Sequence, residues 1–187
     1  MIVFKKYYDI LGADEDASPE TFEKQARQEK LDDSLFLAIR AGDIRGVRKA
    51  VRGGAHVNSE QDNISVIVYA VAYRNIKIIR YLLKQGADAN VYNGAKIPIL
   101  VMAMSTTPKG YWSLNSRIVR LLLKHGANPR ATSKLGCSLF TYADCLDRWT
   151  LGLARKYAKN FPEDRSRWEI HLEILADAIT GRAAENR

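Results

Sequence analysis

Apolar residues recur at helical spacing in three pairs of short segments between residues 33 and 125. The first segment of each pair reads SLFLAIRAGD, SVIVYAVAYRN or IPILVMAMS, and the second reads IRGVRKAV, IKIIRYLL or RIVRLLL. Apolar spacings of three and four residues predict helices with one apolar face. Each pair is followed by a glycine-alanine turn, and these turns are Gly54-Ala55, Gly86-Ala87 and Gly126-Ala127. The pattern therefore predicts a repeated unit of two short helices and a turn.

Turn and capping residues mark where each predicted helix begins and ends. The three glycines follow the second helix, where a left-handed residue commonly ends a helix. Asp43, Asn75 and Asn115 hold equivalent positions before the second helix and are good N-caps. A fourth, degenerate copy begins in GCSLFTYADC, residues 136–145. Equivalent core positions in the four copies are Leu35, Ile67, Ile99 and Leu139.

The segment of about 33–160 resembles the ankyrin repeat. The likeness is strongest at IIRYLLKQGADAN and IVRLLLKHGANPR, although DSLF, SVIV, IPIL and CSLF replace the family's Thr-Pro-Leu-His tetrad. The resemblance implies an all-α solenoid of three to four helix-turn-helix repeats with helical caps at both ends, in which stacking buries the apolar faces. It also implies a protein that binds through its hairpin tips and its inner helices, the first of each pair.

The N-terminal stretch YYDILGADEDASPETFEKQAR, residues 7–27, resembles the start of a J-domain, a module that stimulates a chaperone. The His-Pro-Asp tripeptide on which that activity depends is absent from the sequence. Two interpretations stay open: a J-like fragment kept as a helical cap over residues 7–30, or a convergent match of a short helix, a turn and an N-cap. In both, Ser18 caps a helix through about Lys30, and residues 1–31 form an N-terminal cap.

Residues 161–187 are predicted to be a capping helix and tail after the repeats at 32–160. The sequence FPEDRSRWEIHLEILADAITGR is typical of one amphipathic helix, with Pro162 at its start and Gly181 at its end. Such an element would seal the last repeat against water. Its apolar face consists of Trp168, Leu172, Leu175 and Ile179.

An insertion at residues 105–116, STTPKGYWSLNS, lengthens the third repeat. Its proline, glycine and polar residues predict a loop between the two helices of that repeat. Tyr111 and Trp112 lie in this loop. They either fold back over the stack as a lid or form an aromatic contact loop, since Tyr and Trp are favoured interface residues.

The net charge of +8 and the isoelectric point near 9.5 favour an acidic partner, a nucleic acid or simple solvation. Three cations, here called the basic ridge, fall two residues after the N-caps: Arg45, Lys77 and Arg117. A positive charge there opposes the helix dipole by about 0.3–1 kcal/mol each. The ridge suggests a protein partner with an acidic surface. The alternatives are binding of nucleic acid or another acidic ligand, and exposed charge screened by salt.

Six further residues are candidates for contact with a partner protein. Four lie at the predicted hairpin tips, and these are Tyr92, Lys96, Arg130 and Lys134. Two occupy exposed positions near the ends of inner helices, Arg40 and Tyr73. For each of the six, the alternative is a solvated surface residue without a partner.

No catalytic, cofactor or metal motif is present in the sequence. The histidines His56, His125 and His171 have no cysteine or carboxylate at a recognised spacing, and Cys137 and Cys145 match no zinc spacing. We therefore expect a chain that is not an enzyme and has no cofactor.

The function expected from these patterns is that of an adaptor, an inhibitor or a host-directed effector that binds another protein. A structural subunit of a larger assembly is the alternative. The N-terminus has no signal-peptide pattern, and no stretch approaches the ~20 apolar residues of a membrane span. We therefore expect a cytoplasmic or nuclear location, or the host cytosol for a secreted effector, without membrane contact.

Overall fold

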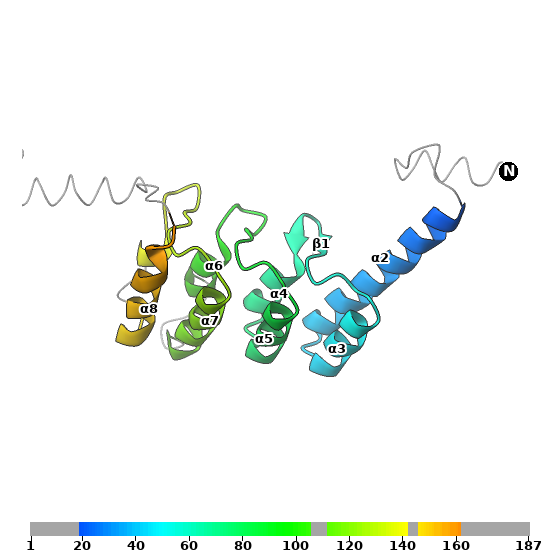
Figure 1. Ribbon diagram of the computed structural model, residues 1–187, viewed down its shortest axis with the longest axis horizontal. Helices are drawn as coiled ribbons and strands as arrows, with labels where there is room; N and C mark the ends of the chain where they lie inside the picture. Colours follow the sequence, from blue (N-terminus) through cyan, green and yellow to red (C-terminus); the bar gives the residue numbers. More distant parts are fainter. Residues whose placement is uncertain (1–18, 106–111, 142–145, 162–187) are drawn as a thin grey trace, which may run out of the picture.

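The computed structural model describes residues 19–105, 112–141 and 146–161 of the 187-residue chain. Over these residues the chain is a row of short helices packed side by side, with turns projecting along one edge (Figure 1). The helices are α2 (Pro19–Arg40), α3 (Ile44–Arg52), α4 (Val66–Ala72), α5 (Ile76–Lys84), α6 (Ile99–Ser105), α7 (Trp112–Lys124) and α8 (Arg148–Ala158). A short antiparallel hairpin of β1 (Glu60–Gln61) and β2 (Ile64–Ser65) lies between α3 and α4.

The helices pack in two rows that share one core. The first helices of the pairs follow the order α2, α4, α6, and the second helices follow the order α3, α5, α7, α8. In the first three pairs, each second helix also packs on the first helix of its own pair: α3 on α2, α5 on α4 and α7 on α6. The four predicted core residues Leu35, Ile67, Ile99 and Leu139 are all buried. The all-α solenoid of stacked repeats is thus confirmed.

Two of the three predicted N-caps are confirmed, and the third is wrong. Asp43 accepts a hydrogen bond of 2.9 Å from a backbone N–H in the first turn of α3, and Asn75 accepts one of 3.2 Å in α5. Asn115 is instead a buried residue inside α7, because that helix already begins at Trp112. The insertion at 105–116 therefore contributes an extra helical turn and not only a loop.

The predicted left-handed turns are confirmed. The backbone φ angles are +105°, +90° and +87° at Gly54, Gly86 and Gly126. Arg74 adopts φ +54° at the position where the first repeat has Gly42 at φ +69°, and a residue with a Cβ is strained there. The Arg74 guanidinium donates a hydrogen bond to the side-chain oxygen of Asn115. This strained residue thereby links the second repeat to α7 of the third.

Helix α2 runs without a break from Pro19 to Arg40, whereas the sequence predicted one helix through about Lys30 and a separate first repeat helix. The two predicted elements are one helix because no glycine or proline interrupts residues 20–40. A Cβ built on Gly53 would lie 3.5 Å from the Cδ2 atom of Leu31, so α2 covers the end of α3. The part of the predicted cap before residue 19 lies outside the described residues.

Asparagine side chains tie each turn to the next one along the stack. Asn58 donates to the carbonyl of Gly86 at 3.2 Å and accepts from the N–H of Asp88 at 2.8 Å. Asn90 repeats this arrangement in the next interval, with bonds of 3.0 and 2.7 Å. The turns are therefore held in register by two side-chain bonds per interval.

The first turn receives the same pair of bonds from α2. The Gln28 side chain donates to the carbonyl of Gly54 at 2.9 Å, and Asp32 accepts from the N–H of His56 at 2.7 Å. Gln28 also donates to Asp32 at 3.0 Å, which fixes the two side chains on the helix. Helix α2 thus stands in the place of a preceding turn.

Candidate protein-binding surfaces

The first helices expose two large apolar side chains. Leu37 on α2 is 65% exposed, and Tyr73 at the end of α4 is 52% exposed. Between these helices, the rings of Phe36 and Tyr69 form an edge-to-face pair with centroids 5.5 Å apart. An exposed aromatic residue on a packed helix is a typical anchor for a protein partner. The row of first helices therefore offers apolar contacts on a rigid support.

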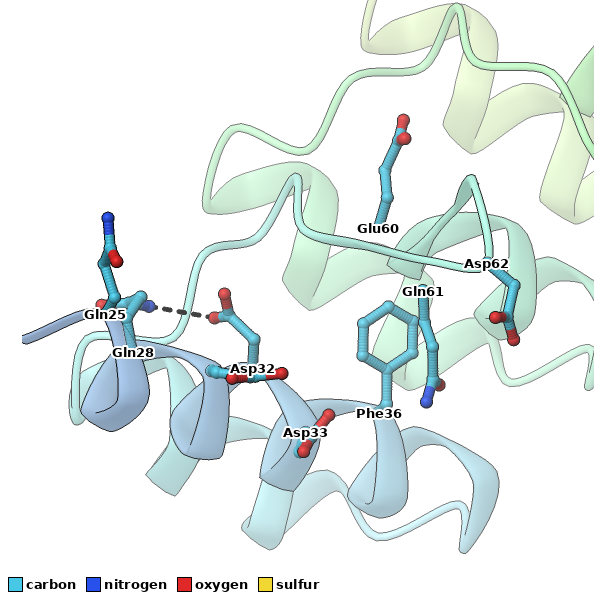
Figure 2. Close-up of a pocket in the computed structure, with 9 residues that line it drawn as sticks. Gln25, Gln28, Asp32, Asp33, Phe36, Glu60, Gln61 and Asp62 are labelled. Carbon is cyan, nitrogen blue, oxygen red and sulfur yellow. Dashed lines mark hydrogen bonds between the residues drawn. The ribbon is translucent and has the colours of Figure 1, made fainter. Parts of the chain in front are cut away.

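A cavity of about 490 Å³ lies between α2 and the β1–β2 hairpin (Figure 2). No lysine or arginine of the described chain lines it. Carboxylates in a cleft with protein walls concentrate negative potential, because the low-dielectric walls focus the field. The lining of the cavity is therefore negatively charged. Its lining residues are Gln25, Gln28, Glu29, Asp32, Asp33, Phe36, Glu60, Gln61 and Asp62.

The hairpin places two carboxylates of this acidic cavity opposite those on α2 (Figure 2). Glu60 pairs with Ser65 across the two strands. The turn residues Asp62 and Asn63 have φ angles of +53° and +58°. Two positive φ values fit a two-residue hairpin turn, and Asp and Asn tolerate them better than most side chains. The turn chemistry thus fixes Asp62 at the hairpin tip.

The second helices carry the basic ridge on their exposed surface. Arg45, Lys77 and Arg117 are all exposed, on α3, α5 and α7. In the fourth copy the N-cap of α8 is Asp147, and the position two residues later holds Trp149, which is 57% exposed. Sequence reasoning missed this tryptophan because the fourth copy is degenerate. The signal in the sequence is that Trp149 lies two residues after Asp147, as the ridge residues lie two residues after their N-caps.

Two cations of α7 lie over the ring of Trp149. The guanidinium carbon of Arg120 is 5.0 Å from the ring centroid, and the ammonium nitrogen of Lys124 is 5.8 Å from it. Arg48 lies in a similar way over Tyr81, at 5.7 Å, between the first and second repeats. Such contacts are favourable because the ring face is electronegative. They join neighbouring second helices on the outer surface.

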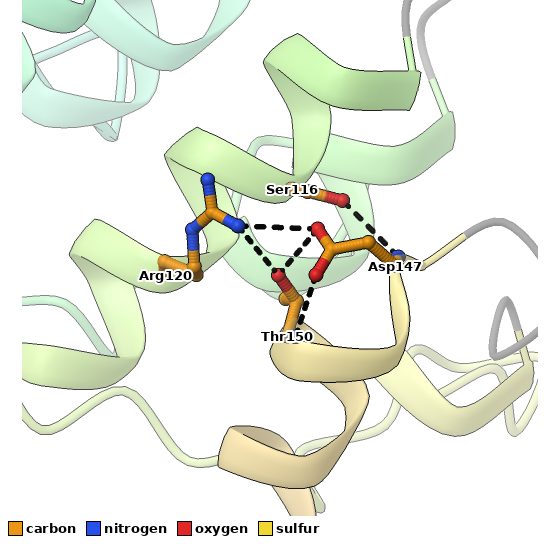
Figure 3. A network of polar contacts seen from close by, with 4 residues as sticks. All are labelled: Ser116, Arg120, Asp147 and Thr150. Atoms are coloured by element: carbon orange, nitrogen blue, oxygen red, sulfur yellow. Dashed lines mark hydrogen bonds and ion pairs between the residues drawn. The ribbon is translucent and has the colours of Figure 1, made fainter.

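Arg120 also belongs to a polar network at the start of α8 (Figure 3). Its guanidinium donates to Asp147 at 3.2 Å and to the Thr150 hydroxyl at 3.3 Å. Thr150 donates to Asp147 through its backbone N–H at 2.8 Å and its hydroxyl at 2.7 Å. Desolvation raises the pKa of Asp147. Hydrogen bonds with Thr150 and the Ser116 hydroxyl, together with the positive charge of Arg120, lower the pKa by more than desolvation raises it. The pKa of Asp147 therefore lies below its ordinary value.

A family model for ankyrin repeats, in three copies, matches residues 35–133, which is more than half of the chain. The chain belongs to the ankyrin repeat family. Ankyrin repeats are generic protein-protein interaction modules, and proteins of the family are generally non-catalytic. The likeness of residues 7–30 to the start of a J-domain is not borne out. Residues 19–30 are instead continuous with the first ankyrin helix, and residues 7–18 lie outside the described part of the chain.

The chain is similar to several larger ankyrin proteins. An ankyrin repeat-containing protein of Treponema pallidum (strain Nichols) is 33% identical over 119 residues, which are 63% of this chain and 38% of that protein. The ankyrin repeat, SAM and basic leucine zipper domain-containing protein 1 of Mus musculus is 26% identical over 129 residues, 68% of this chain and 26% of that protein. An ankyrin repeat and KH domain-containing protein of Caenorhabditis briggsae is 37% identical over 67 residues, 36% of this chain and 2% of that protein. The chain spans less than two fifths of the length of each relative.

Two of the predicted contact residues lie together on one ankyrin turn, after α5. The Asn93 side chain accepts hydrogen bonds from the N–H groups of Ala95 and Ile97 at 3.0 and 2.9 Å, which closes this turn. Tyr92 and Lys96 are exposed on either side of it, and Lys96 has φ +57°. An ordered turn thus presents both side chains to solvent.

The other predicted contact residues differ in their surroundings. Arg40 and Lys134 are exposed. Arg130 donates through its Nε atom to a backbone carbonyl at the end of α8, at 3.0 Å, so it also holds the third ankyrin turn against that helix. Tyr111 lies outside the described residues, and Trp112 begins α7 with a side chain that is not described.

Within residues 19–105, 112–141 and 146–161, no group of three or more His, Cys, Asp or Glu side chains is placed to hold a metal ion. No helix of that part of the chain has the length and apolar character needed to cross a bilayer. The candidate sites on the described residues are three surfaces: the acidic cavity, the exposed residues of the first helices and turns, and the basic ridge.

Proposed function

We propose that this chain is a non-catalytic adaptor, inhibitor or effector that binds a partner protein through its hairpin tips, its first helices and the insertion. The observation that carries the proposal is the acidic cavity between α2 and the hairpin, next to the exposed Leu37. Apolar anchors supply most of the affinity of protein interfaces, and complementary charge supplies specificity and a faster encounter. The general role of ankyrin repeats as interaction modules supports the same proposal.

The partner segment that suits this surface has Lys or Arg beside apolar residues. A cationic side chain that enters the cavity meets carboxylates of α2 and of the hairpin, and charge-assisted hydrogen bonds are stronger than neutral ones. Leu37 and Tyr73 then offer contacts to the apolar residues of the segment. The cavity thus suits a cationic partner, whereas the positive net charge of the chain favours an acidic one. An acidic partner surface stays our prediction for the basic ridge.

A displayed peptide library selected against the full chain tests the proposal. We expect enrichment of peptides that place Lys or Arg next to Leu, Ile or Phe. Fluorescence anisotropy then gives the dissociation constant of the selected peptides. Replacing Glu60→Lys together with Asp62→Lys should weaken binding by about tenfold or more, because each removes an attraction and adds a repulsion.

The matched control is Glu20→Lys with Glu23→Lys. It changes the net charge by the same amount on exposed residues of α2 that do not line the cavity. Enrichment of acidic peptides, or equal weakening by both pairs of substitutions, would reject the cavity as the contact site. Binding that persists in the cavity variant but fails in Leu37→Asp would move the site onto the first helices alone.

A second candidate function is the binding of nucleic acid or another acidic ligand by the basic ridge. The observation that favours it is the exposed Trp149, which continues the ridge on α8. Cations next to a stacking aromatic ring are the usual elements of single-strand binding. A salt titration with a single-stranded oligonucleotide should show a steep loss of affinity. Arg45→Glu, Lys77→Glu and Arg117→Glu together should abolish binding, whereas Lys49→Glu, Lys84→Glu and Lys159→Glu should weaken it less.

A further inference from the structure

One face of α8 is made of residues whose equivalents on α7 contact the next second helix of the stack. On α7, the Ser116 hydroxyl accepts a hydrogen bond from the backbone N–H of Asp147 at 3.5 Å, and Arg120 and Lys124 lie over Trp149. These three residues of α7 thus face α8. The residues 32 positions later on α8 are Arg148, Gly152 and Lys156. If the stack continued, a further second helix would therefore pack on this face of α8.

The face is shaped for a close neighbour. A cavity of about 540 Å³ lies along it, lined by Arg148, Trp149, Gly152, Leu153 and Lys156. Gly152 stands where the three earlier repeats have an arginine, and a Cβ built on it would meet no described atom within 4 Å. A glycine inside a helix costs about 1 kcal/mol relative to alanine, so it is expected where another backbone comes close. The exposed ring and Leu153 form an apolar floor, and Arg148 and Lys156 add positive charge.

We propose that residues 162–187 of the same chain dock on this face of α8. The described residues reach Phe161, three residues beyond the end of α8, and 26 residues of sequence follow. The sequence of this segment predicts an amphipathic helix with Trp168 in its apolar face. A helix of about 15 residues measures roughly 22 Å, which is enough to cover the 11 residues of α8.

Charge complementarity selects this occupant. Three carboxylates recur every four residues in the segment, at Glu169, Glu173 and Asp177, so they share one side of the predicted helix. They match the cations Arg148 and Lys156 that line the cavity. A short tether also raises the effective concentration of the segment at the face to the order of millimolar, so a weak contact suffices. The acidic cavity and the three cations of the basic ridge take no part in this docking, which shares only Trp149 with the second candidate function.

Hydrogen exchange of the full chain, followed by mass spectrometry, tests the docking. We expect amides of residues 166–179 to be protected, and Lys156→Glu to lower that protection by about three- to tenfold. Arg155→Glu is the matched control, because the neighbouring residue is exposed, carries the same charge and does not line the cavity. Adding Glu169→Lys and Glu173→Lys to Lys156→Glu should restore the protection. The amides of α4 and α5 report in the same experiment whether each variant is folded.

Unprotected amides at 166–179 in the unmodified chain would overturn the proposal. Equal losses in Lys156→Glu and Arg155→Glu would also overturn it, because the segment would then lie elsewhere. A zero-length carboxylate-amine crosslinker gives an answer that needs no variant. The expected product joins Lys156 to a carboxylate of residues 169–177, and crosslinks of these carboxylates only to lysines outside the face would reject the docking.

Discussion

The two ends of the stack differ in what covers them. At the first end, α2 continues past α3, and its Gln28 and Asp32 bond the first turn as asparagines bond the later turns. At the last end, α8 leaves a lined cavity with Trp149 exposed. At the first end, one continuous helix therefore supplies the hydrogen bonds that a preceding turn makes elsewhere in the stack. At the last end, the docking proposed for residues 162–187 would cover the face of α8.

The two ends also differ in charge. Five carboxylates and no described cation line the cavity at the first end, whereas Arg148 and Lys156 line the one at the last end. The net charge of +8 is a sum over the whole chain and does not show this difference. A partner inferred from the net charge fits the second helices but not the surface between α2 and the hairpin. Charge has to be assigned to a surface before it indicates a partner.

The largest expected effect comes from a core residue of the first end. Leu35 is fully buried on α2, so Leu35→Ala should lower the free energy of unfolding by about 2–5 kcal/mol. Leu153 on α8 is only partly buried, and Leu153→Ala should cost about 1 kcal/mol, because less apolar area is lost. Urea denaturation followed by far-UV circular dichroism compares them. Equal losses would show that the two ends are equally well packed.

The next effect tests the bonds that α2 makes to the first turn. Asp32→Ala removes the acceptor for the N–H of His56 and for Gln28, and should cost about 1–3 kcal/mol. Asp33→Ala is the control, because that neighbour is exposed, and surface substitutions usually stay within about 0.5 kcal/mol. Thermal unfolding of the two variants gives the comparison. Similar melting temperatures would mean that α2 does not stabilise the turn through Asp32.

The stacked fold could be predicted because its signals are local and repeated. The apolar spacing around Ile67 or Ile99 and the glycine that ends each second helix are both visible within one repeat. The end of a helix predicted at about Lys30 came from the likeness to a J-domain. No glycine or proline near Lys30 would end a helix there. Asn115 looks like a cap in sequence, but the insertion adds a helical turn before it, and its side chain then serves as a buried acceptor for Arg74.

The candidate surfaces were harder to predict than the fold. The basic ridge was predicted because its three members are equivalent in the repeat. The acidic cavity joins Glu29 and Asp33 to Glu60 and Asp62, which only the packing of the hairpin against α2 brings together. Separation in sequence hides such a site, since neither acidic stretch differs from ordinary solvated charge when taken alone.

A smaller effect is expected from the aromatic contact at the last end. Trp149→Ala removes the ring beneath Arg120 and Lys124 and should cost about 0.5–2 kcal/mol. Trp149→Phe keeps a weaker ring and should lose about half as much. Leu135→Ala serves as the control, because that side chain is 84% exposed on another turn. Chemical denaturation in low and high salt measures these differences, and a neutral Trp149→Ala would show that the stacking adds nothing to the last end.

The smallest effect concerns the pH dependence of the last end. The pKa of the Asp147 carboxyl is lower in the folded chain than its ordinary value of about 3.9. The ionised carboxylate therefore adds stability that is fully present above about pH 5 and is lost as the pH falls through the folded pKa. The effect is modest because the Asp147 side chain is partly exposed and its ion pair with Arg120 is screened. Asp147→Asn cannot titrate, so the difference in urea midpoint between the two chains should shrink between about pH 5 and pH 3. A difference that stays constant over this range would mean that the network at the start of α8 does not depend on the charge of Asp147.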